Sequence, residues 1–315
     1  MTTTMNINDC IDYLKAHDGY LIVTHIRPDG DTLGCAAALC HTLRRMGKTA
    51  YILKNPELMR SYEAWIAPFH APEDFAAETV VAVDMAAESV FPIGFDRHVD
   101  LCIDHHATNS GYADHVCCEP EDAACGELVL KLVKGLVGGL DRETADYLYI
   151  AVSTDTGCFV YANTTADTHR AAAELIEAGA DMESLNVKLF RTFSYSRVLL
   201  ESMIYGGLRR YHNGEINVAT VTLDMMERAG ATEDDCDDLA SLAGRVEGNR
   251  VSCTIRQMGP SECKISLRSG EFFDSAAVCA LHGGGGHRMA AGCTVLETPE
   301  RAREILVREI EEAMG

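Results

Sequence analysis

Two short tracts of His and Asp residues carry the groups that could do chemistry in this 315-residue chain. The first contains His25, Asp29 and Asp31, and the second is Asp104-His105-His106. Because a single glycine separates Asp29 from Asp31, a tightly turned backbone can aim both carboxylates at one point. One or two divalent cations would remove the repulsion between them. We therefore interpret the two tracts as parts of a hydrolytic metal site.

Each tract follows a short apolar run that is rich in β-forming residues. Tyr20 to Val23 precedes the first tract, and Val99 to Ile103 leads into the second. A helix-like segment from Thr32 to Met46 follows the first tract. The ligands thus lie in strand-to-helix loops, at the carboxyl ends of strands where open α/β sheets bind their ligands.

Two further carboxylates occupy the ends of predicted elements. Asp84 follows the apolar run 80–83, and Asp155 ends a helical stretch that begins near Glu143. Carboxylates with a minority of His, and without the Cys spacing of structural zinc sites, suit Mn²⁺ or Mg²⁺. Two such ions roughly 3.5–4 Å apart can activate a water molecule and neutralise a phosphoryl group. Phosphoester hydrolysis is therefore the expected reaction, and the absence of a Gly-x-x-x-x-Gly-Lys-Ser/Thr loop argues against an ATPase or kinase.

These four motifs occur in the order found in the DHH phosphoesterases, a family that the chain resembles over nearly its whole length. A fifth motif, the glycine-rich run from Gly283 to Gly292, is similar to the signature of the DHHA1 subfamily. Within the family, the chain looks most like the compact bacterial oligoribonucleases that also remove a phosphate from 3′-phosphoadenosine 5′-phosphate (pAp).

The resemblance implies a role for each residue of the motifs. Asp84 would bridge two metal ions, which would be Mn²⁺, with Mg²⁺ or Co²⁺ as alternatives. His106 would contact the scissile phosphate or help to protonate the leaving oxygen. Cys35 stands where relatives commonly carry Ser. The implied ligands are His25, Asp29 and Asp84 for one ion, and Asp31, Asp84, His105 and Asp155 for the other.

The carboxyl-terminal part of the chain supplies the predicted substrate-binding residues. Consecutive glycines let backbone N–H groups approach a phosphate or a base closely, and His287 could donate to phosphate or stack on a base. Arg268 and Ser269 match an Arg-Ser pair that relatives use on the terminal phosphate, and a guanidinium can grip phosphate through two hydrogen bonds. The glycines of this site are Gly284, Gly285 and Gly286.

The pattern of apolar runs predicts an α/β chain of two domains. Residues 1–190 would form the catalytic domain, a parallel sheet with helices on both faces, and 191–207 a linker. Residues 208–315 would form a smaller mixed α+β domain, opening with a β-hairpin. Its other expected elements are strands at 251–257 and 263–267 and helices at 233–242, 273–281 and 301–313.

Composition limits the partners that the protein can have. A net charge of −21 and a pI near 4.9 would repel a long polyanion, so short nucleotides are expected rather than long nucleic acid. No apolar run reaches the ~20 residues of a membrane helix. The thirteen cysteines show no Cys-x-x-Cys spacing and suit a reducing cytosol, so a cytoplasmic location is expected. A homodimer is left open.

The resulting hypothesis is a Mn²⁺-dependent phosphoesterase that removes mononucleotides from very short RNAs or dinucleotides such as pApA, and that also converts pAp to AMP. A cyclic-di-AMP phosphodiesterase is the alternative within the same chemistry. A nucleotide sensor that has lost catalysis is the alternative of another class. A manganese pyrophosphatase is disfavoured by the glycine-rich signature at 283–292. The preferred substrate and the polarity of cleavage stay open.

Overall fold

The chain folds into two compact units in the computed structural model, which describes residues 2–236 and 238–315. Unit 1 extends to Thr192, and unit 2 begins at Phe193. The predicted domain boundaries and the linker at 191–207 stay predictions. In the structure, most of that linker range is helix α8 (Tyr195–Gly207), whose buried Leu200 and Ile204 belong to a core of unit 2.

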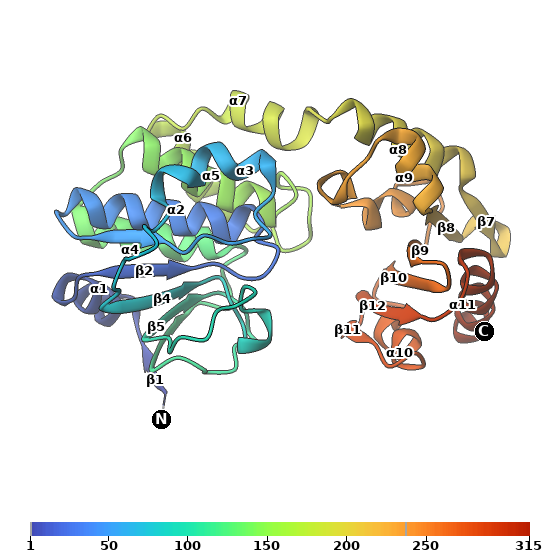
Figure 1. Cartoon of the computed structure of the whole chain (residues 1–315), viewed down its shortest axis with the longest axis horizontal. Coiled ribbons are helices and arrows are strands. Elements are labelled where there is room, and N and C mark those ends of the chain that lie inside the picture. Colours follow the sequence, from blue (N-terminus) through green and yellow to red (C-terminus); the bar gives the residue numbers. More distant parts are fainter. Residues whose placement is uncertain (1, 237) are drawn as a thin grey trace. The chain divides into compact units, whose positions relative to one another are not determined.

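Unit 1 is built on a six-stranded sheet of order β1-β6-β5-β4-β2-β3, in which each strand pair is parallel (Figure 1). The strands are β1 (Thr3–Met5), β2 (Tyr20–Val23), β3 (Ala50–Ile52), β4 (Thr79–Val83), β5 (Leu101–Asp104) and β6 (His115–Cys118). The helices are α1 (Ile7–Ala16), α2 (Gly30–Arg45), α3 (Arg60–Ile66), α4 (Cys125–Val137), α5 (Arg142–Asp155), α6 (Ala166–Glu177) and α7 (Met182–Asn186). Short 3-10 helices η1 (Ala67–Phe69) and η2 (Glu88–Val90) and a π-helical turn η3 (Val187–Arg191) complete the unit.

Alternate side chains along the central strands enter two different cores, as the two-residue period of a strand requires. One core contains Ile22 and Val81 and is shared with helices α1, α2, α4 and α5. The other contains Val23 and Ala82 and is closed by loops and by residues at η2. Burial on both faces explains why these strands are continuous apolar runs. The expected parallel sheet with helices is confirmed, although its two faces are covered unevenly, with these four α-helices on the first.

The sheet order places three of the ligand-bearing loops side by side. Strand β4 lies between β2 and β5, and all three run in the same direction. Their carboxyl ends therefore meet at one edge of the sheet, where the chain continues to His25, Asp84 and His105.

Close packing of α2 against α5 supplies the fourth position. A Cβ added at Gly30 would lie 2.4 Å from the Thr154 side chain, and one added at Gly34 would lie 2.4 Å from the Tyr147 carbonyl oxygen. Only glycine lets the two helices approach so closely. Because Asp155 is the last residue of α5, this contact brings its carboxylate towards the first turn of α2.

Unit 2 contains a mixed sheet of order β11-β12-β10-β9-β8-β7, in which only β8 and β9 pair in parallel among the described strands. The expected hairpin at its start, β7 to β8, is confirmed. The strands are β7 (Arg209–Tyr211), β8 (Ile216–Val221), β9 (Val251–Gly259), β10 (Glu262–Ser269), β11 (Gly285–His287) and β12 (Ala290–Val295). The other elements are α9 (Leu223–Ala229), α10 (Ser275–Ala280), α11 (Pro299–Met314) and 3-10 helices η4 (His212–Gly214), η5 (Glu233–Cys236) and η6 (Leu239–Arg245).

One predicted helix of unit 2 is wrong. The segment 233–242 forms no continuous α-helix in the described residues, but two 3-10 helices, η5 and η6. Asp238 interrupts them with a left-handed backbone, φ 53°, a conformation that Asp tolerates better than most residues but that a right-handed helix excludes. Residue 237, also within this prediction, lies outside the described residues.

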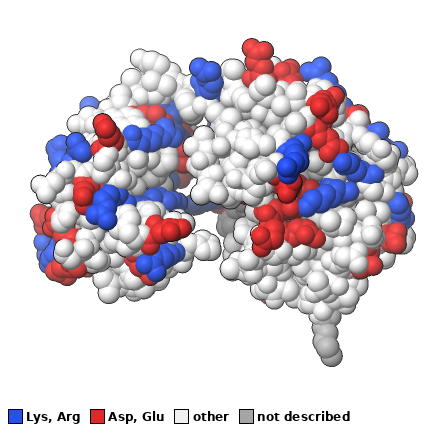
Figure 2. Space-filling model, turned by 180° about the vertical axis from the view of Figure 1, so that it is seen from behind, with Lys and Arg blue, Asp and Glu red and all other residues white. Residues whose placement is uncertain are grey.

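Acidic and basic side chains are interspersed on the face of the molecule that Figure 2 displays. Lys and Arg side chains on this face lie beside Asp and Glu rather than in a continuous basic band. Among the described residues, none of the helices combines the length and apolar character that a membrane crossing requires.

Asp141 generates a prediction about the stability of unit 1. Its carboxylate caps α5 by accepting from the Thr144 N–H at 2.8 Å, and it contacts the His41 ring and the Arg45 guanidinium of α2 at 3.1 and 2.9 Å. Partial burial opposes ionisation, yet the hydrogen bonds from Thr144 and the contact with His41 lower the pKa of Asp141 to about 2. Asp141→Ala should therefore lower the free energy of unfolding by about 1–2 kcal/mol at pH 7.

Urea unfolding of both proteins against pH would test this expectation. A carboxyl whose pKa is depressed by folding stabilises above its unfolded value of about 3.9 and loses that contribution as the pH falls towards the folded value. The charge-dependent part of the difference should therefore shrink between about pH 4 and pH 2. Asp141→Asn is the matched control, since Asn also caps helices. Equal stability of Asp141→Ala and the unchanged protein at pH 7 would contradict the role of the cap.

Candidate metal centre

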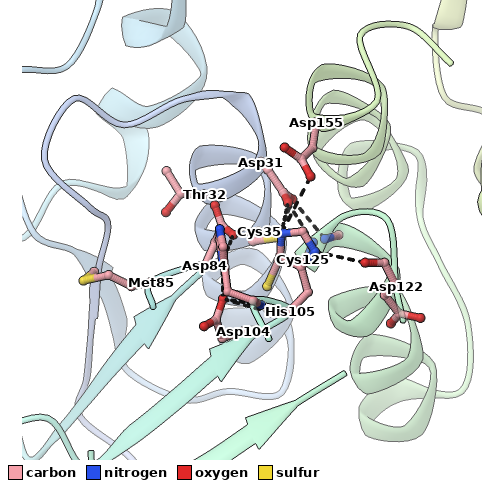
Figure 3. Close-up of polar contacts among 12 residues, drawn as sticks. Asp31, Thr32, Cys35, Asp84, Met85, Asp104, His105, Asp122, Cys125 and Asp155 are labelled. Atoms are coloured by element: carbon pink, nitrogen blue, oxygen red, sulfur yellow. Dashed lines mark hydrogen bonds and ion pairs between the residues drawn. The ribbon is translucent and has the colours of Figure 1, made fainter. Parts of the chain in front are cut away.

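The structure brings the six predicted metal ligands together in two groups at the carboxyl edge of the unit 1 sheet. One group is His25, Asp29 and Asp84, and the other is Asp31, His105 and Asp155. Within each group, the potential ligand atoms lie within 4.8 Å of one another. Figure 3 shows Asp31, Asp84, His105 and Asp155 converging from the strands and from α2 and α5. That these residues bind metal stays a prediction.

Asp84 links the two groups through its two carboxylate oxygens. Its Oδ2 lies 3.8 Å from Nε2 of His25, and its Oδ1 lies 3.5 Å from Nε2 of His105. The same His105 nitrogen lies 3.6 Å from Asp155 Oδ2 and 3.9 Å from Asp31 Oδ2. Each oxygen of Asp84 thus faces a different group, which is the arrangement that a carboxylate shared by two cations requires.

Backbone carbonyls fix the orientation of both histidines. Nδ1 of His25 lies 2.8 Å from the carbonyl oxygen of Ile26, and Nδ1 of His105 lies 3.0 Å from that of Asp122. A carbonyl can only accept, so Nδ1 donates in both rings and, in the neutral imidazole, Nε2 keeps its lone pair. Both lone pairs therefore point at carboxylates, which leaves them available to a cation. Metal-binding histidines are commonly held in this way.

Two of the carboxylates are almost fully buried, and a nearby positive charge would stabilise their ionised forms. Asp31 is 1 % exposed and Asp84 is 4 % exposed, and Oδ1 of Asp84 has no hydrogen-bond partner among the described residues. Burial, followed by repulsion from neighbouring carboxylates, raises the pKa of both groups well above the usual range. Asp84 also adopts a left-handed backbone, φ 55°, a strained conformation of the kind found at functional sites. The residues present therefore fit a divalent cation.

His106 belongs to a hydrogen-bond network of its own. Its Nδ1 donates to Asp104 Oδ1 at 2.7 Å, while Asn109 donates to the other oxygen of Asp104 at 2.6 Å. The bond to Asp104, supported by the charges of Asp104 and Asp84, raises the pKa of His106 to about 9. The side chain is 43 % exposed, so its other nitrogen can reach a ligand. His106 is thus held as a positively charged donor next to Asp84, 3.6 Å away.

The predicted substrate residues gather within unit 2. Gly285, Gly286 and His287 form strand β11, which lies at the edge of the sheet and has no strand on its outer side among the described residues. His287 pairs with Ala290 of β12, and Ala290 pairs with Arg268 of β10. Residues directly opposite one another point to the same face, so Arg268 and His287 flank a small alanine at about 10 Å, two strand spacings. Both are exposed.

Gly284 and Ser269 have structural roles beside this row. A Cβ at Gly284 would lie 2.3 Å from the Gly292 carbonyl oxygen, so glycine is required there for the close approach to β12. Ser269 shares a hydrogen bond of 2.9 Å with the hydroxyl of Ser275, the first residue of α10. Binding of substrate by any of these residues stays a prediction.

Several hydrogen bonds at the centre do not follow from the sequence analysis. Asp104 belongs to the second tract, but the sequence does not indicate its bond to His106. The carbonyl of Asp122 and the N–H groups of Cys125 and Gly126, which contact His105 and Asp31, are backbone groups that any residue type could supply. Only Asp104, a buried carboxylate beside two histidines, carried a signal in its residue type.

Comparisons with known proteins agree with this geometry. Residues 20–152 match the DHH family, N-terminal domain, and residues 214–315 match the DHHA1 domain. The chain is 33 % identical over 289 residues to the bifunctional oligoribonuclease and PAP phosphatase NrnA of Thermus thermophilus, covering 90 % of this chain and 86 % of that protein. It is 24 % identical over 306 residues to the Bacillus subtilis protein of the same name, covering 94 % and 95 %.

A solved structure shares the fold over almost the entire length. The exopolyphosphatase-related protein from Bacteroides fragilis superimposes with a TM-score of 0.86 at 22 % identity, covering 97 % of this chain and 95 % of that one. With both family domains matched in order, and a relative of 33 % identity over most of its length, the chain belongs to the DHH/DHHA1 family of phosphoesterases.

Proposed function

We propose that the protein is a two-metal phosphoesterase that hydrolyses short oligoribonucleotides and dinucleotides such as pApA to mononucleotides, and that it also removes the 3′-phosphate of pAp. The observation that carries the proposal is the joint presence of the six converging ligands and 33 % identity to a bifunctional oligoribonuclease and PAP phosphatase. The 86 % coverage of that relative supports a comparison of whole proteins.

Two manganese ions are the proposed cofactors. His25 and Asp29 would hold one ion, Asp31, His105 and Asp155 the other, and Asp84 both. When bound, the ions would lower the pKa of a water and neutralise negative charge on the phosphoryl group. Four carboxylates with two imidazoles, His25 and His105, favour Mn²⁺ or Mg²⁺ over structural zinc.

His106 would act on the phosphate or on the leaving oxygen. Its ring donates from Nδ1 to Asp104, which leaves Nε2 to donate to a phosphoryl oxygen when the ring is charged. The partial exposure of the side chain allows this contact. A charged donor at this position would neutralise phosphate charge and could pass its proton to the departing oxygen.

Unit 2 would bind the part of the substrate that does not react. The backbone N–H groups of β11, the His287 ring and the Arg268 guanidinium would offer donors for a terminal phosphate. A net charge of −21 disfavours a long polyanion, so this site would suit short nucleotides.

Two alternatives lead to different results in one experiment. A cyclic-di-AMP phosphodiesterase would use the same metal centre, and a sensor without catalysis would bind nucleotide without turnover. The complete set of converging ligands argues against the sensor.

The deciding assay measures turnover of pApA, pAp, cyclic-di-AMP, a five-nucleotide RNA and pyrophosphate by metal-stripped protein with and without Mn²⁺, with Asp84→Asn as control. We expect Mn²⁺ to restore activity, highest on the short linear nucleotides, and Asp84→Asn to lose at least about 100-fold in kcat, because both ions lose a ligand. The variant should unfold no earlier than the metal-free protein, since it removes a buried, repelled charge. Nucleotide binding without any turnover would favour the sensor instead.

Asp104→Asn tests how His106 is held. The variant keeps the shape of a side chain that is 0 % exposed but removes the charge that raises the pKa of His106 to about 9. In metal-stripped protein, the His106 ring should therefore titrate nearer to the ordinary value of about 6.5, as followed by NMR of its ring protons. Removal of a group that holds a metal-site residue in place typically lowers metal affinity or activity by about 10–100-fold, so kcat with Mn²⁺ should fall by a similar factor. An unchanged titration would contradict the assigned network.

His287→Ala tests recognition separately from chemistry. A hydrogen bond to a charged group contributes about 1.5–3 kcal/mol, so KM for pApA and pAp should rise about tenfold or more, while kcat is largely retained. His98→Ala, which changes an exposed histidine of unit 1, is the control. The same KM for all short substrates would remove the recognition role of His287.

A further inference from the structure

The carboxylate of Asp31 is held by donors from two helices. On α4, the first N–H groups donate to it, Cys125 N to Oδ2 at 2.7 Å and Gly126 N to Oδ1 at 3.0 Å. On α2, the thiol of Cys35 donates to Oδ1 at 3.3 Å. Figure 3 shows Cys35 and Cys125 beside Asp31. The free N–H groups and the dipole at the start of a helix favour a negative charge at this place.

Counting acceptor positions shows what these donors leave open. An ionised carboxylate has about four lone-pair positions, two on each oxygen. The donors from Gly126 and Cys35 occupy both positions of Oδ1, and the donor from Cys125 occupies one position of Oδ2. One position of Oδ2 remains, and Oδ2 is the oxygen that faces His105 Nε2 at 3.9 Å. Asp31 can therefore offer one oxygen to one cation, in contrast to Asp84.

We propose that Cys35 is a positioning residue that acts together with the first turn of α4. The two fix Asp31 so that only Oδ2 faces the metal ion that Asp31, His105, Asp155 and Asp84 would hold. This inference rests on the two-metal function proposed above. Cys35 follows Asp31 by one helical turn, so the two side chains lie on the same face of α2. The side chain of Cys35 is fully buried, so bulk water cannot replace its thiol as a donor to Asp31.

Without the thiol, Oδ1 would keep only the donor from Gly126. The carboxylate could then turn about its terminal torsion, which is soft in Asp, and Oδ2 would no longer be held towards the cation. The remaining proposed ligands of that ion, Asp84, His105 and Asp155, would be unchanged. The affinity for the other ion, which His25, Asp29 and Asp84 would hold, should not change.

Metal titration of three variants tests the proposal without relying on activity. Mn²⁺ binding to metal-stripped protein would be followed by calorimetry and by EPR of free Mn²⁺ for Cys35→Ala, Cys35→Ser and Cys40→Ala. Cys40 is the matched control, a fully buried cysteine five residues further along α2 in the core of unit 1. The expected result is one site about tenfold weaker in Cys35→Ala, the low end for an outer-shell partner because a thiol is a weak donor.

Cys35→Ser should bind both ions like the unchanged protein, because its hydroxyl also donates, and Cys40→Ala should do the same. Two sites of unchanged affinity in Cys35→Ala, or equal losses in all three variants, would overturn the positioning role. Fewer than two Mn²⁺ bound by the unchanged protein would instead overturn the proposed two-metal function, on which the inference depends.

Discussion

Repulsion between buried carboxylates is the constraint on which the centre of unit 1 depends. Asp31 and Asp84 are almost completely buried, and burial and repulsion from neighbouring carboxylates raise the pKa of both. Ionised groups in such a place are stable only when a positive charge or several donors balance them. The Asp31 carboxylate receives three donors, whereas one oxygen of Asp84 receives none among the described residues. Asp84, the ligand that two cations would share, is therefore the carboxylate whose charge the protein itself balances less.

The fold holds this unfavourable arrangement by placing each carboxylate in a strand or helix, or directly beside the end of one. Three parallel strands bring loops to one edge of the sheet, and the contact of Gly30 and Gly34 with α5 brings Asp155 to the same place. Backbone carbonyls orient the rings of His25 and His105. Sites on packed strands and helices are held more accurately than sites on loops, and the helices here form one core with the sheet. The stability of that core opposes the repulsion at its edge.

The main elements and the convergence of the candidate ligands could be predicted, because residue type and the spacing of apolar residues indicate them. The strand at 20–23 and the helix ending at Asp155 have the predicted ends, and the candidate ligand side chains meet at the edge where the parallel strands end. The 3-10 segments at 233–245 were missed, because a local left-handed residue, Asp238, decides them. The donors to Asp31 were missed because they are backbone N–H groups, which depend on where α4 begins and not on which residues begin it.

Cys35, whose sulfur could in principle bind a soft metal, lies beside the carboxylates of the candidate metal centre. All thirteen cysteines are free, and burial raises the pKa of Cys35 well above the usual range. A thiol that stays protonated is a weak hydrogen-bond donor, whereas only a thiolate is a good ligand for soft metals. Cys35 can therefore lie 3.3 Å from Asp31 without turning the centre into a zinc or copper site. The same burial that leaves the carboxylates in need of a balancing cation keeps the neighbouring sulfur neutral, so the low dielectric of the site and its oxygen ligands both agree with the hard cations proposed above.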